Sequence, residues 1–331
     1  MVDYKKKIID SLSILQKKEQ QEKNVFKARA YTKIISQLKN LDSSIQIENY
    51  EDLAKNKILG IGEKISAKIK EIIQTGELAA AVAIEEDPKL VAFNIMTKIY
   101  GVGSVKANTI IDRKITTISQ LREYNLKHPK FLNENQKIGL KYYEEINERI
   151  PREEITKYES ELLKIINEVV PNLKIMIVGS YRRGALNSGD IDILVTYDST
   201  ITQKKAAEYF KQFIKELQGK SIITDILAYG TKKCLAVSRL NSEFKHRRID
   251  FLLTSPKEYP FALLYFTGSD KFNIETRKIA NKKGYTLNEH ELKPLPSESE
   301  TKQSKPLPPR LNTEKEILEF LDIPYILPTN R

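Results

Sequence analysis

The sequence predicts a multidomain α+β protein in which an all-α half precedes a half built around a β-sheet. The chain has 331 residues, which is enough for two or more domains with separate hydrophobic cores. Apolar residues recur at helical spacing up to about residue 150, and short apolar runs typical of strands follow, with helices between them. This order of elements favours a mainly antiparallel sheet in the second half.

The composition suits a folded, soluble protein, because 40% of the residues are hydrophobic and 30% are charged. No run of about 18 apolar residues is present, so we expect no membrane span. The first 20 residues are charged throughout and lack the apolar core of a signal peptide. A single cysteine, Cys234, excludes an internal disulfide and fits a reducing compartment. We therefore expect an intracellular protein, without a preference between nucleus and cytoplasm.

The chain is strongly basic, with 55 basic and 44 acidic residues and a net charge of +11. A basic excess of this size indicates a polyanionic partner, most simply nucleic acid. The alternative is a lysine-rich surface that only maintains solubility, and net charge alone does not separate the two.

The first half contains helices and two similar turns. Residues 1–40 have apolar residues at helical spacing among many lysines, which predicts two helices with basic outer faces. Gly60-Ile61-Gly62 and Gly101-Val102-Gly103 each lead into a helical stretch and form a weak internal repeat. Such turns look like helix-hairpin-helix motifs, whose glycines let backbone N–H groups meet a DNA phosphate. The alternative for each turn is an ordinary connection between helices.

The second half opens with an amphipathic helix over residues 158–170. Short apolar runs predict strands at residues 174–179, 190–197, 233–240 and 247–254. A further helix is expected over residues 206–218, a Pro- and Ser-rich solvated loop over 292–311, and a short closing helix over 313–321.

Two aspartates interrupt an otherwise apolar strand. Asp190 and Asp192 share one face of the expected strand, because side chains two residues apart point the same way. Adjacent carboxylates repel each other and lose hydration, which is costly unless a cation lies between them. If the strand that contains Asp250 is a neighbour, three carboxylates converge in a form that suits Mg²⁺. The alternative is an edge strand with one polar face.

The residues before this strand indicate a phosphate-binding site. Gly179 lets a ligand approach the backbone closely, and Ser180 with the following amides can cap a helix start and bind a phosphate. Arg183 supplies a planar cation for phosphate oxygens. Together with the three aspartates, these residues form a nucleotidyltransferase constellation.

The segment GSYRRGALNSGDIDILVT is similar to the catalytic palm of the X family of DNA polymerases, of the DNA polymerase beta type. Residues 263–292, with YFTGSD and a following FN, and residues 137–154 resemble two further segments of the family. The similarity runs from about Asn24 to the C-terminus, so we expect no extra N-terminal domain. It implies a helical lyase and DNA-binding domain (1–83), a helical duplex-binding subdomain (84–147), a catalytic palm with an antiparallel-rich sheet (148–256) and a small α+β nucleotide-selection subdomain (257–331).

The resemblance implies template-directed DNA synthesis in which Asp190, Asp192 and Asp250 hold two Mg²⁺ ions, for which Mn²⁺ can substitute. It implies a gap-filling role in base excision repair, with gapped or nicked duplex DNA and a deoxynucleoside triphosphate (dNTP) as substrates. We expect a monomer, and the sequence names no protein partner. The implied contacts with the dNTP are Arg149, Gly179, Ser180, Arg183, Gly189, Tyr265, Phe266, Gly268, Asp270 and Asn273. The implied DNA contacts are Lys27, Tyr31, Gly60, Gly62, Lys64, Gly101, Gly103, Arg248 and Arg277.

A second activity is implied for the first half, because Lys68 matches the family lysine that forms a Schiff base with a 5′-deoxyribose phosphate. A lysine nucleophile must be neutral, and crowded cations such as Lys64 lower its pKa. The alternative is that Lys68 only coats a basic DNA-binding face. The resemblance also implies a Na⁺ or K⁺ ion at each hairpin turn, held by backbone carbonyls of Asn56, Ile58 and Ile61 and of Thr97, Ile99 and Val102.

The sequence departs from the family at several positions. Leu252 stands where DNA polymerase beta has an arginine that pairs with an active-site carboxylate, and Asn56 and Ala80 replace basic residues of the lyase region. Two other functions stay open beside the gap-filling polymerase. One is a template-independent terminal nucleotidyltransferase, and the other is a catalytically decayed DNA-binding protein.

Overall fold

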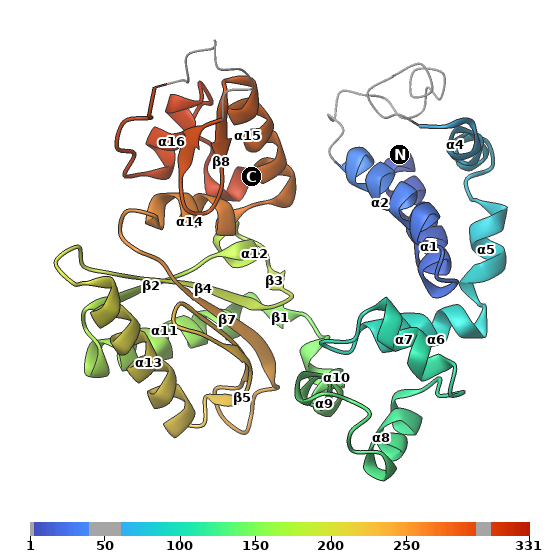
Figure 1. Cartoon of the computed structure of the whole chain (residues 1–331), viewed down its shortest axis with the longest axis horizontal. Coiled ribbons are helices and arrows are strands. Elements are labelled where there is room, and N and C mark those ends of the chain that lie inside the picture. Colours follow the sequence, from blue (N-terminus) through green and yellow to red (C-terminus); the bar gives the residue numbers. More distant parts are fainter. Residues whose placement is uncertain (1–2, 40–60, 296–305) are drawn as a thin grey trace. The chain divides into compact units, whose positions relative to one another are not determined.

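The computed structural model describes residues 3–39, 61–295 and 306–331 of the chain. It contains two compact units, Met1–Tyr143 and Glu144–Arg331 (Figure 1). The first unit is helical and the second combines helices with a sheet, so the predicted α+β class is confirmed. None of the helices in the described part of the chain is both long and apolar enough to cross a bilayer.

The first unit contains only helices within its described residues. They are α1 (Tyr4–Gln21), α2 (Val25–Lys39), α4 (Glu63–Thr75), α5 (Ala79–Glu85), α6 (Pro88–Thr97), α7 (Ser104–Ile111), α8 (Ile118–Lys127) and α9 (Glu134–Lys141), and α10 (Tyr143–Ile146) begins at the last residue of the unit. The predicted helical spacing of the first segment is confirmed, because Ile8, Leu12 and Leu15 are buried on one face of α1. They pack with α2, α4 and α5 in one core, and α6 to α9 surround a second.

Side-chain caps define where α8 and α9 begin, and the cap of α9 also contacts the second glycine turn. Thr117 caps α8 and Asn133 caps α9, each in a reciprocal capping box with a glutamine three residues later. The glutamine of α9, Gln136, also donates a hydrogen bond to the carbonyl of Gly101 at 2.9 Å. Gly101 has φ +78°, a left-handed conformation that favours glycine, so the turn and the cap of α9 stabilise each other.

The second unit is built on a five-stranded sheet with the order β2-β4-β7-β6-β5. Its strands are β2 (Leu173–Ile177), β4 (Ile191–Tyr197), β5 (Ile223–Tyr229), β6 (Lys233–Ser238) and β7 (Arg247–Leu253), and β1 (Ile150–Pro151) pairs with β3 (Asn187–Ser188) separately. All pairs in the large sheet are antiparallel except β4 with β7, which is parallel. The predicted antiparallel-rich sheet is therefore confirmed.

Sequence reasoning predicted four of the five strands and missed β5. This strand lies at the edge of the sheet, and its pairing with β6 shifts register between Ile223 and Asp225 and again between Ile226 and Ala228. Each shift interrupts the two-residue alternation of apolar and polar side chains, which is the signal that identifies a strand.

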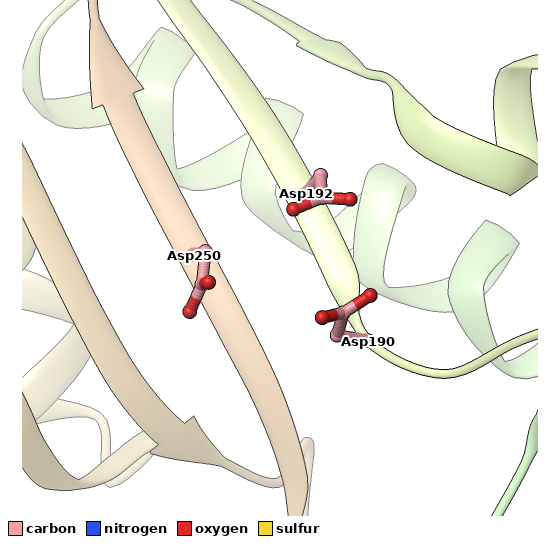
Figure 2. A group of neighbouring side chains, drawn as sticks. All are labelled: Asp190, Asp192 and Asp250. Atoms are coloured by element: carbon pink, nitrogen blue, oxygen red, sulfur yellow. The ribbon is translucent and has the colours of Figure 1, made fainter. Parts of the chain in front are cut away.

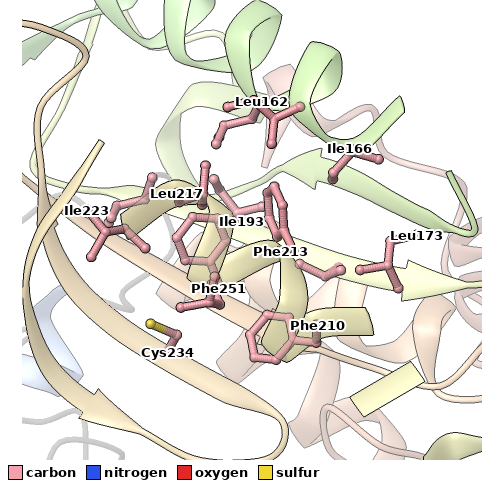
Figure 3. Packing of buried hydrophobic residues seen from close by; sticks show 14 of the residues in the cluster. Leu162, Ile166, Leu173, Ile193, Phe210, Phe213, Leu217, Ile223, Cys234 and Phe251 are labelled. Atoms are coloured by element: carbon pink, nitrogen blue, oxygen red, sulfur yellow. The ribbon is translucent and has the colours of Figure 1, made fainter. Parts of the chain in front are cut away.

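Two helices, α11 (Arg152–Val169) and α13 (Gln203–Gly219), cover one face of the sheet (Figure 3). Leu162 of α11 and Phe213 of α13 pack there against Ile193 and Phe251 of the central strands. Cys234 is buried in the same core. Because strand side chains alternate, burial of Ile193 and Phe251 turns Asp192 and Asp250 toward the other face.

The C-terminal part of this unit has a core of its own. It comprises α14 (Tyr259–Thr267), α15 (Asp270–Lys282), the hairpin of β8 (Tyr285–Leu287) and β9 (Leu292–Pro294), α16 (Glu314–Phe320) and a 3₁₀ turn, η1 (Pro328–Asn330). The short helix α12 (Gly179–Arg182) follows β2 and contributes no residue to this core. Helix α14 connects this core to the sheet, because its Ala262 packs with Val178 and Leu194 beside the aspartates.

Candidate metal and nucleotide site

Three aspartates meet on the sheet face that α11 and α13 leave free. The parallel register of β4 and β7 places Asp192 directly opposite Asp250, and Asp190 lies one residue before β4 begins. Carboxylate oxygens of Asp190, Asp192 and Asp250 all lie within 4.8 Å of one another (Figure 2). The expected convergence of three carboxylates from two neighbouring strands is confirmed.

The electrostatics of this cluster favour a bound cation. Burial, together with the negative charges of Asp190 and Asp250, raises the pKa of Asp192 to about 7. Burial also raises the pKa of Asp250, and the charge of Arg248 opposes that shift. Asp250 Oδ1 is buried and has no hydrogen-bond partner among the described residues. Crowded carboxylates with an unsatisfied oxygen are a donor set that suits a hard divalent cation, so these residues fit the expected metal.

Arg248 is the nearest counter-ion of the cluster. Its Nη2 lies 3.1 Å from Asp190 Oδ2 and 3.3 Å from Asp250 Oδ2. The sequence predicted Arg248 as a DNA contact, and this bridging contact with the two carboxylates was missed. The available signal was its position two residues before Asp250, which places both side chains on one face of β7.

The chain approaches Asp192 closely at Gly179. Gly179 has φ +59°, and a Cβ atom there would lie 2.6 Å from Asp192 Oδ2. Glycine is thus required both by the backbone conformation and by the aspartate beside it. Helix α12 begins at Gly179 with Val178 as its N-cap, so the expectation that Ser180 caps the helix start is wrong. The hydroxyl of Ser180 lies inside the first turn of α12 and donates to Ser188 Oγ at 2.8 Å.

Two arginines predicted to contact the triphosphate lie near this helix and the short strand β3. Arg183 donates from Nη1 to the carbonyl of Thr267 at 2.6 Å. Arg149 donates to the side chain and to the backbone carbonyl of Asn187, both at 2.8 Å. Gly189 lies beside Arg149, because a Cβ atom there would be 3.2 Å from Arg149 Nη1. These contacts orient the guanidinium groups before any ligand binds.

The residues predicted to select the nucleotide are grouped around the end of α14 and the start of α15. Tyr265 and Phe266 form an edge-to-face pair with 5.0 Å between ring centroids, and Gly268 forms the C-cap of α14. Asn273 donates to the carbonyl of Tyr265 at 2.7 Å, and the guanidinium carbon of Arg277 lies 4.8 Å from the centre of the Tyr265 ring. Asp270 is exposed in the first turn of α15.

The residues predicted for the lyase lie in the first unit. Lys64 is exposed and Lys68 is half-buried, one turn apart on α4. Lys27 lies 3.5 Å from Glu19 Oε1, and burial together with the charge of Glu19 raises the pKa of Tyr31. Nothing in the sequence distinguished Glu19 from the other acidic residues of α1 as the neighbour of Lys27 and Tyr31.

The two glycine turns are described to different extents. Gly103 is the N-cap of α7 and Gly62 the N-cap of α4, whereas the predicted residues Asn56, Ile58 and Gly60 lie outside the described part of the chain. In the second turn, the carbonyl of Ile99 accepts a hydrogen bond from the N–H of Val102 at 3.0 Å. Ile61 is half-buried, and the hydroxyl of Thr97 donates to the carbonyl of Phe93.

Profiles of four protein families match successive parts of the chain. They are a helix-hairpin-helix domain at residues 3–78, the fingers domain of DNA polymerase lambda at 94–147, the DNA polymerase beta palm at 149–256 and the DNA polymerase beta thumb at 262–331. The sheet with its three carboxylates and glycine-led helix thus has the form of a nucleotidyltransferase palm.

Curated relatives agree with these matches. The chain is 30% identical to DNA polymerase lambda of Arabidopsis thaliana in an alignment 284 positions long, which covers 82% of this chain and 52% of that protein. It is 28% identical to DNA polymerase lambda of Rattus norvegicus in an alignment 341 positions long, which covers 99% of this chain and 56% of that protein. The chain spans about half the length of these relatives. It belongs to the X family of DNA polymerases.

Proposed function

We propose that the chain is a template-directed DNA polymerase that fills short gaps in duplex DNA during base excision repair. The observation that carries this proposal is the convergence of Asp190, Asp192 and Asp250 within 4.8 Å on a palm-like sheet. Gapped or nicked duplex DNA and a dNTP are the proposed substrates. The net charge of +11 supports a polyanionic partner of this kind.

The three carboxylates are proposed to hold two Mg²⁺ ions, which Mn²⁺ can replace. When bound, such ions lower the pKa of the primer 3′-hydroxyl and stabilise the charge of the triphosphate and the leaving pyrophosphate. Arg248 contacts both Asp190 and Asp250 and helps to hold the two carboxylates in place. Gly179 keeps the backbone close to Asp192, which fixes that carboxylate relative to the start of α12.

The phosphates of the dNTP are proposed to contact Ser180, Arg183 and Arg149, with Gly179 and Gly189 leaving room beside them. Arginine forks suit phosphate oxygens, and both arginines are already held by backbone carbonyls. Such prior orientation lowers the cost of ordering these side chains when the substrate binds.

The sugar and base are proposed to meet the segment that joins α14 and α15. Tyr265, Phe266 and Gly268 contact the sugar, and Asp270 and Asn273 lie at the base in this proposal. Arg277 reaches the minor groove of the template strand. The hydrogen bond from Asn273 to Tyr265 and the guanidinium of Arg277 on the same ring support one cooperating group.

The duplex is proposed to contact both glycine turns, Gly60 to Gly62 and Gly101 to Gly103, through backbone N–H groups. A Na⁺ or K⁺ ion at each turn would link the carbonyls to a DNA phosphate. The proposed division is a lyase domain (1–83), a duplex-binding subdomain (84–147), a palm (148–256) and a nucleotide-selection subdomain (257–331), in a monomer.

The first unit is proposed to remove the 5′-deoxyribose phosphate. The neutral amine of Lys68 would add to the C1′ aldehyde with loss of water, and Lys27 and Tyr31 would hold the 5′-phosphate. The half-buried position of Lys68 on α4, with Lys64 one turn away, supports this role. Borohydride should trap a covalent adduct with DNA that is absent in Lys68→Ala, and an undiminished adduct would assign the Schiff base to another lysine.

One substrate tests both activities: duplex DNA with a one-nucleotide gap and a 5′-deoxyribose phosphate at its downstream edge. The template base should dictate which dNTP is incorporated, and Asp190→Ala should abolish extension. Addition without regard to the template would indicate a terminal transferase instead. DNA binding without extension by the wild-type chain would indicate a decayed DNA-binding protein.

A further inference from the structure

A cavity of about 110 Å³ lies behind the aspartates, between the sheet and α14. Its walls include Leu194, Leu235, Leu252 and Phe266, and Asp192 and Asp250 reach it from the metal side. Lys233 is the one cation among the described residues that line it. The walls of the cavity therefore combine two aspartates, one lysine and an apolar surface.

The register of the sheet explains why Lys233 faces this cavity. Lys233 of β6 pairs with Leu252 of β7, and Leu235 pairs with Asp250. Residues paired across antiparallel strands share a face, as do residues two apart along a strand. Lys233 consequently lies on the same face of the sheet as both aspartates. It is level with Leu252, two residues beyond Asp250 along β7.

One oxygen of Asp250 is left without a partner in the described part of the chain, beside this cavity. Arg248 contacts Asp250 through Oδ2, whereas Asp250 Oδ1 is buried and has no hydrogen-bond partner among the described residues. Lys233 is exposed and lines the same cavity as Asp192 and Asp250. Because the ammonium group ends a flexible four-carbon stem, it can fold over Leu252 into the cavity.

We propose that Lys233 is a positioning residue for the metal site, whose ammonium group balances Asp192 and Asp250 from the cavity side and competes with divalent cations for them. This inference rests on the proposed role of the three aspartates as metal ligands. In the metal-free site, the ammonium group of Lys233 offsets the repulsion between the two aspartates. In the metal-bound site, the divalent cations do so instead. Loss of Lys233 then destabilises the metal-free site only.

The test is direct Mn²⁺ binding to the full chain, measured from the electron paramagnetic resonance signal of free Mn²⁺. The variants are Lys233→Gln, Lys233→Arg and the matched control Lys232→Gln. The control removes the same charge one residue away, where it acts on Glu258. Lys233→Gln should bind Mn²⁺ about fivefold more tightly than the wild type, because a nearby like charge is removed from a poorly solvated site. Lys233→Arg and Lys232→Gln should stay within about twofold of the wild type.

Thermal melting supplies a second readout. Without divalent cations, Lys233→Gln should melt at a lower temperature than the wild type, and saturating Mn²⁺ should remove most of that difference. A Lys233→Gln affinity that is unchanged, or that shifts no more than in Lys232→Gln, would overturn the proposal. An Asp192→Asn variant tests the metal-ligand role of the aspartates separately from the role of Lys233. If it binds Mn²⁺ as tightly as the wild type, the aspartates are not the ligands, and the proposed function fails together with the role of Lys233.

Discussion

Glu314 is the centre of a buried ion network whose removal has a predictable cost. The carboxylate of Glu314 accepts two hydrogen bonds from Arg182, at 3.0 and 2.7 Å, and one from Arg331 at 2.6 Å. The exposed fractions of the side chains are 5% for Glu314, 0% for Arg331 and 18% for Arg182. The network joins α12, which begins beside the aspartates, to α16 in the C-terminal core.

Glu314→Gln removes the negative charge and leaves two guanidinium groups in a poorly solvated place. Breaking a buried pair by removing one partner typically costs about 3–5 kcal/mol, and we expect a loss in that range in the free energy of unfolding of the second unit. The matched control is Glu319→Gln on the same helix, whose pair with Lys315 is more than half exposed. An exposed pair contributes about 0–1 kcal/mol, so the control should change little.

The pH dependence gives an independent check on the same charge. Burial opposes ionisation of Glu314, but the hydrogen bonds and charges of Arg182 and Arg331 prevail and hold its pKa below the ordinary 4.5. A lowered pKa in the folded state stabilises the fold fully above the unfolded pKa, and this stabilisation is lost as the pH falls through the folded pKa. The difference between the wild type and Glu314→Gln should be constant between about pH 6 and 8 and shrink as the pH falls below about 4.5.

The assay is urea unfolding followed by tyrosine fluorescence, since the chain has 16 tyrosines and no tryptophan. Hydrogen exchange of peptides from α16 would place the loss in this part of the molecule. A Glu314→Gln variant as stable as Glu319→Gln, or a difference that persists unchanged into acid, would refute the reasoning.

Three further substitutions test other contacts. Gly179→Ala places a Cβ atom 2.6 Å from Asp192 Oδ2, so the rate of gap filling should fall by about 10²-fold as the carboxylate shifts, and an unchanged rate would show that the close approach is unimportant. Gly139→Ala places a Cβ atom 2.7 Å from the Tyr100 carbonyl and should destabilise the first unit by about 1–3 kcal/mol in urea unfolding. Gly103→Ala, with no atom within 4 Å of the new Cβ, is its control, and equal losses would contradict the steric explanation. Glu154→Gln removes the carboxylate that accepts two 2.8 Å hydrogen bonds from the buried Arg247 on β7. A melting temperature equal to that of the wild type would show that this pair contributes nothing to stability.

The regular elements and the paired aspartates could be predicted because they depend on short-range periodicity. The two-residue alternation of a strand determines that Asp190 and Asp192 face one way while Ile191 and Ile193 enter the core. Helical spacing similarly identifies α1, α11 and α13, whose apolar faces repeat within a few residues. The edge strand β5 escaped because its register shifts interrupt that repetition.

The sequence by itself determined that two carboxylates share a face and that a third stands in a similar strand, because these properties follow from local backbone geometry. Only the tertiary structure decided that β7 lies parallel to β4 with Asp250 level with Asp192. The same pairing decided that Arg248 bridges the carboxylates and that Lys233, from a third strand, faces the cavity behind them. Which strands pair, and in which register, is set by the burial of the whole sheet under its helices, and no short window of sequence contains that information.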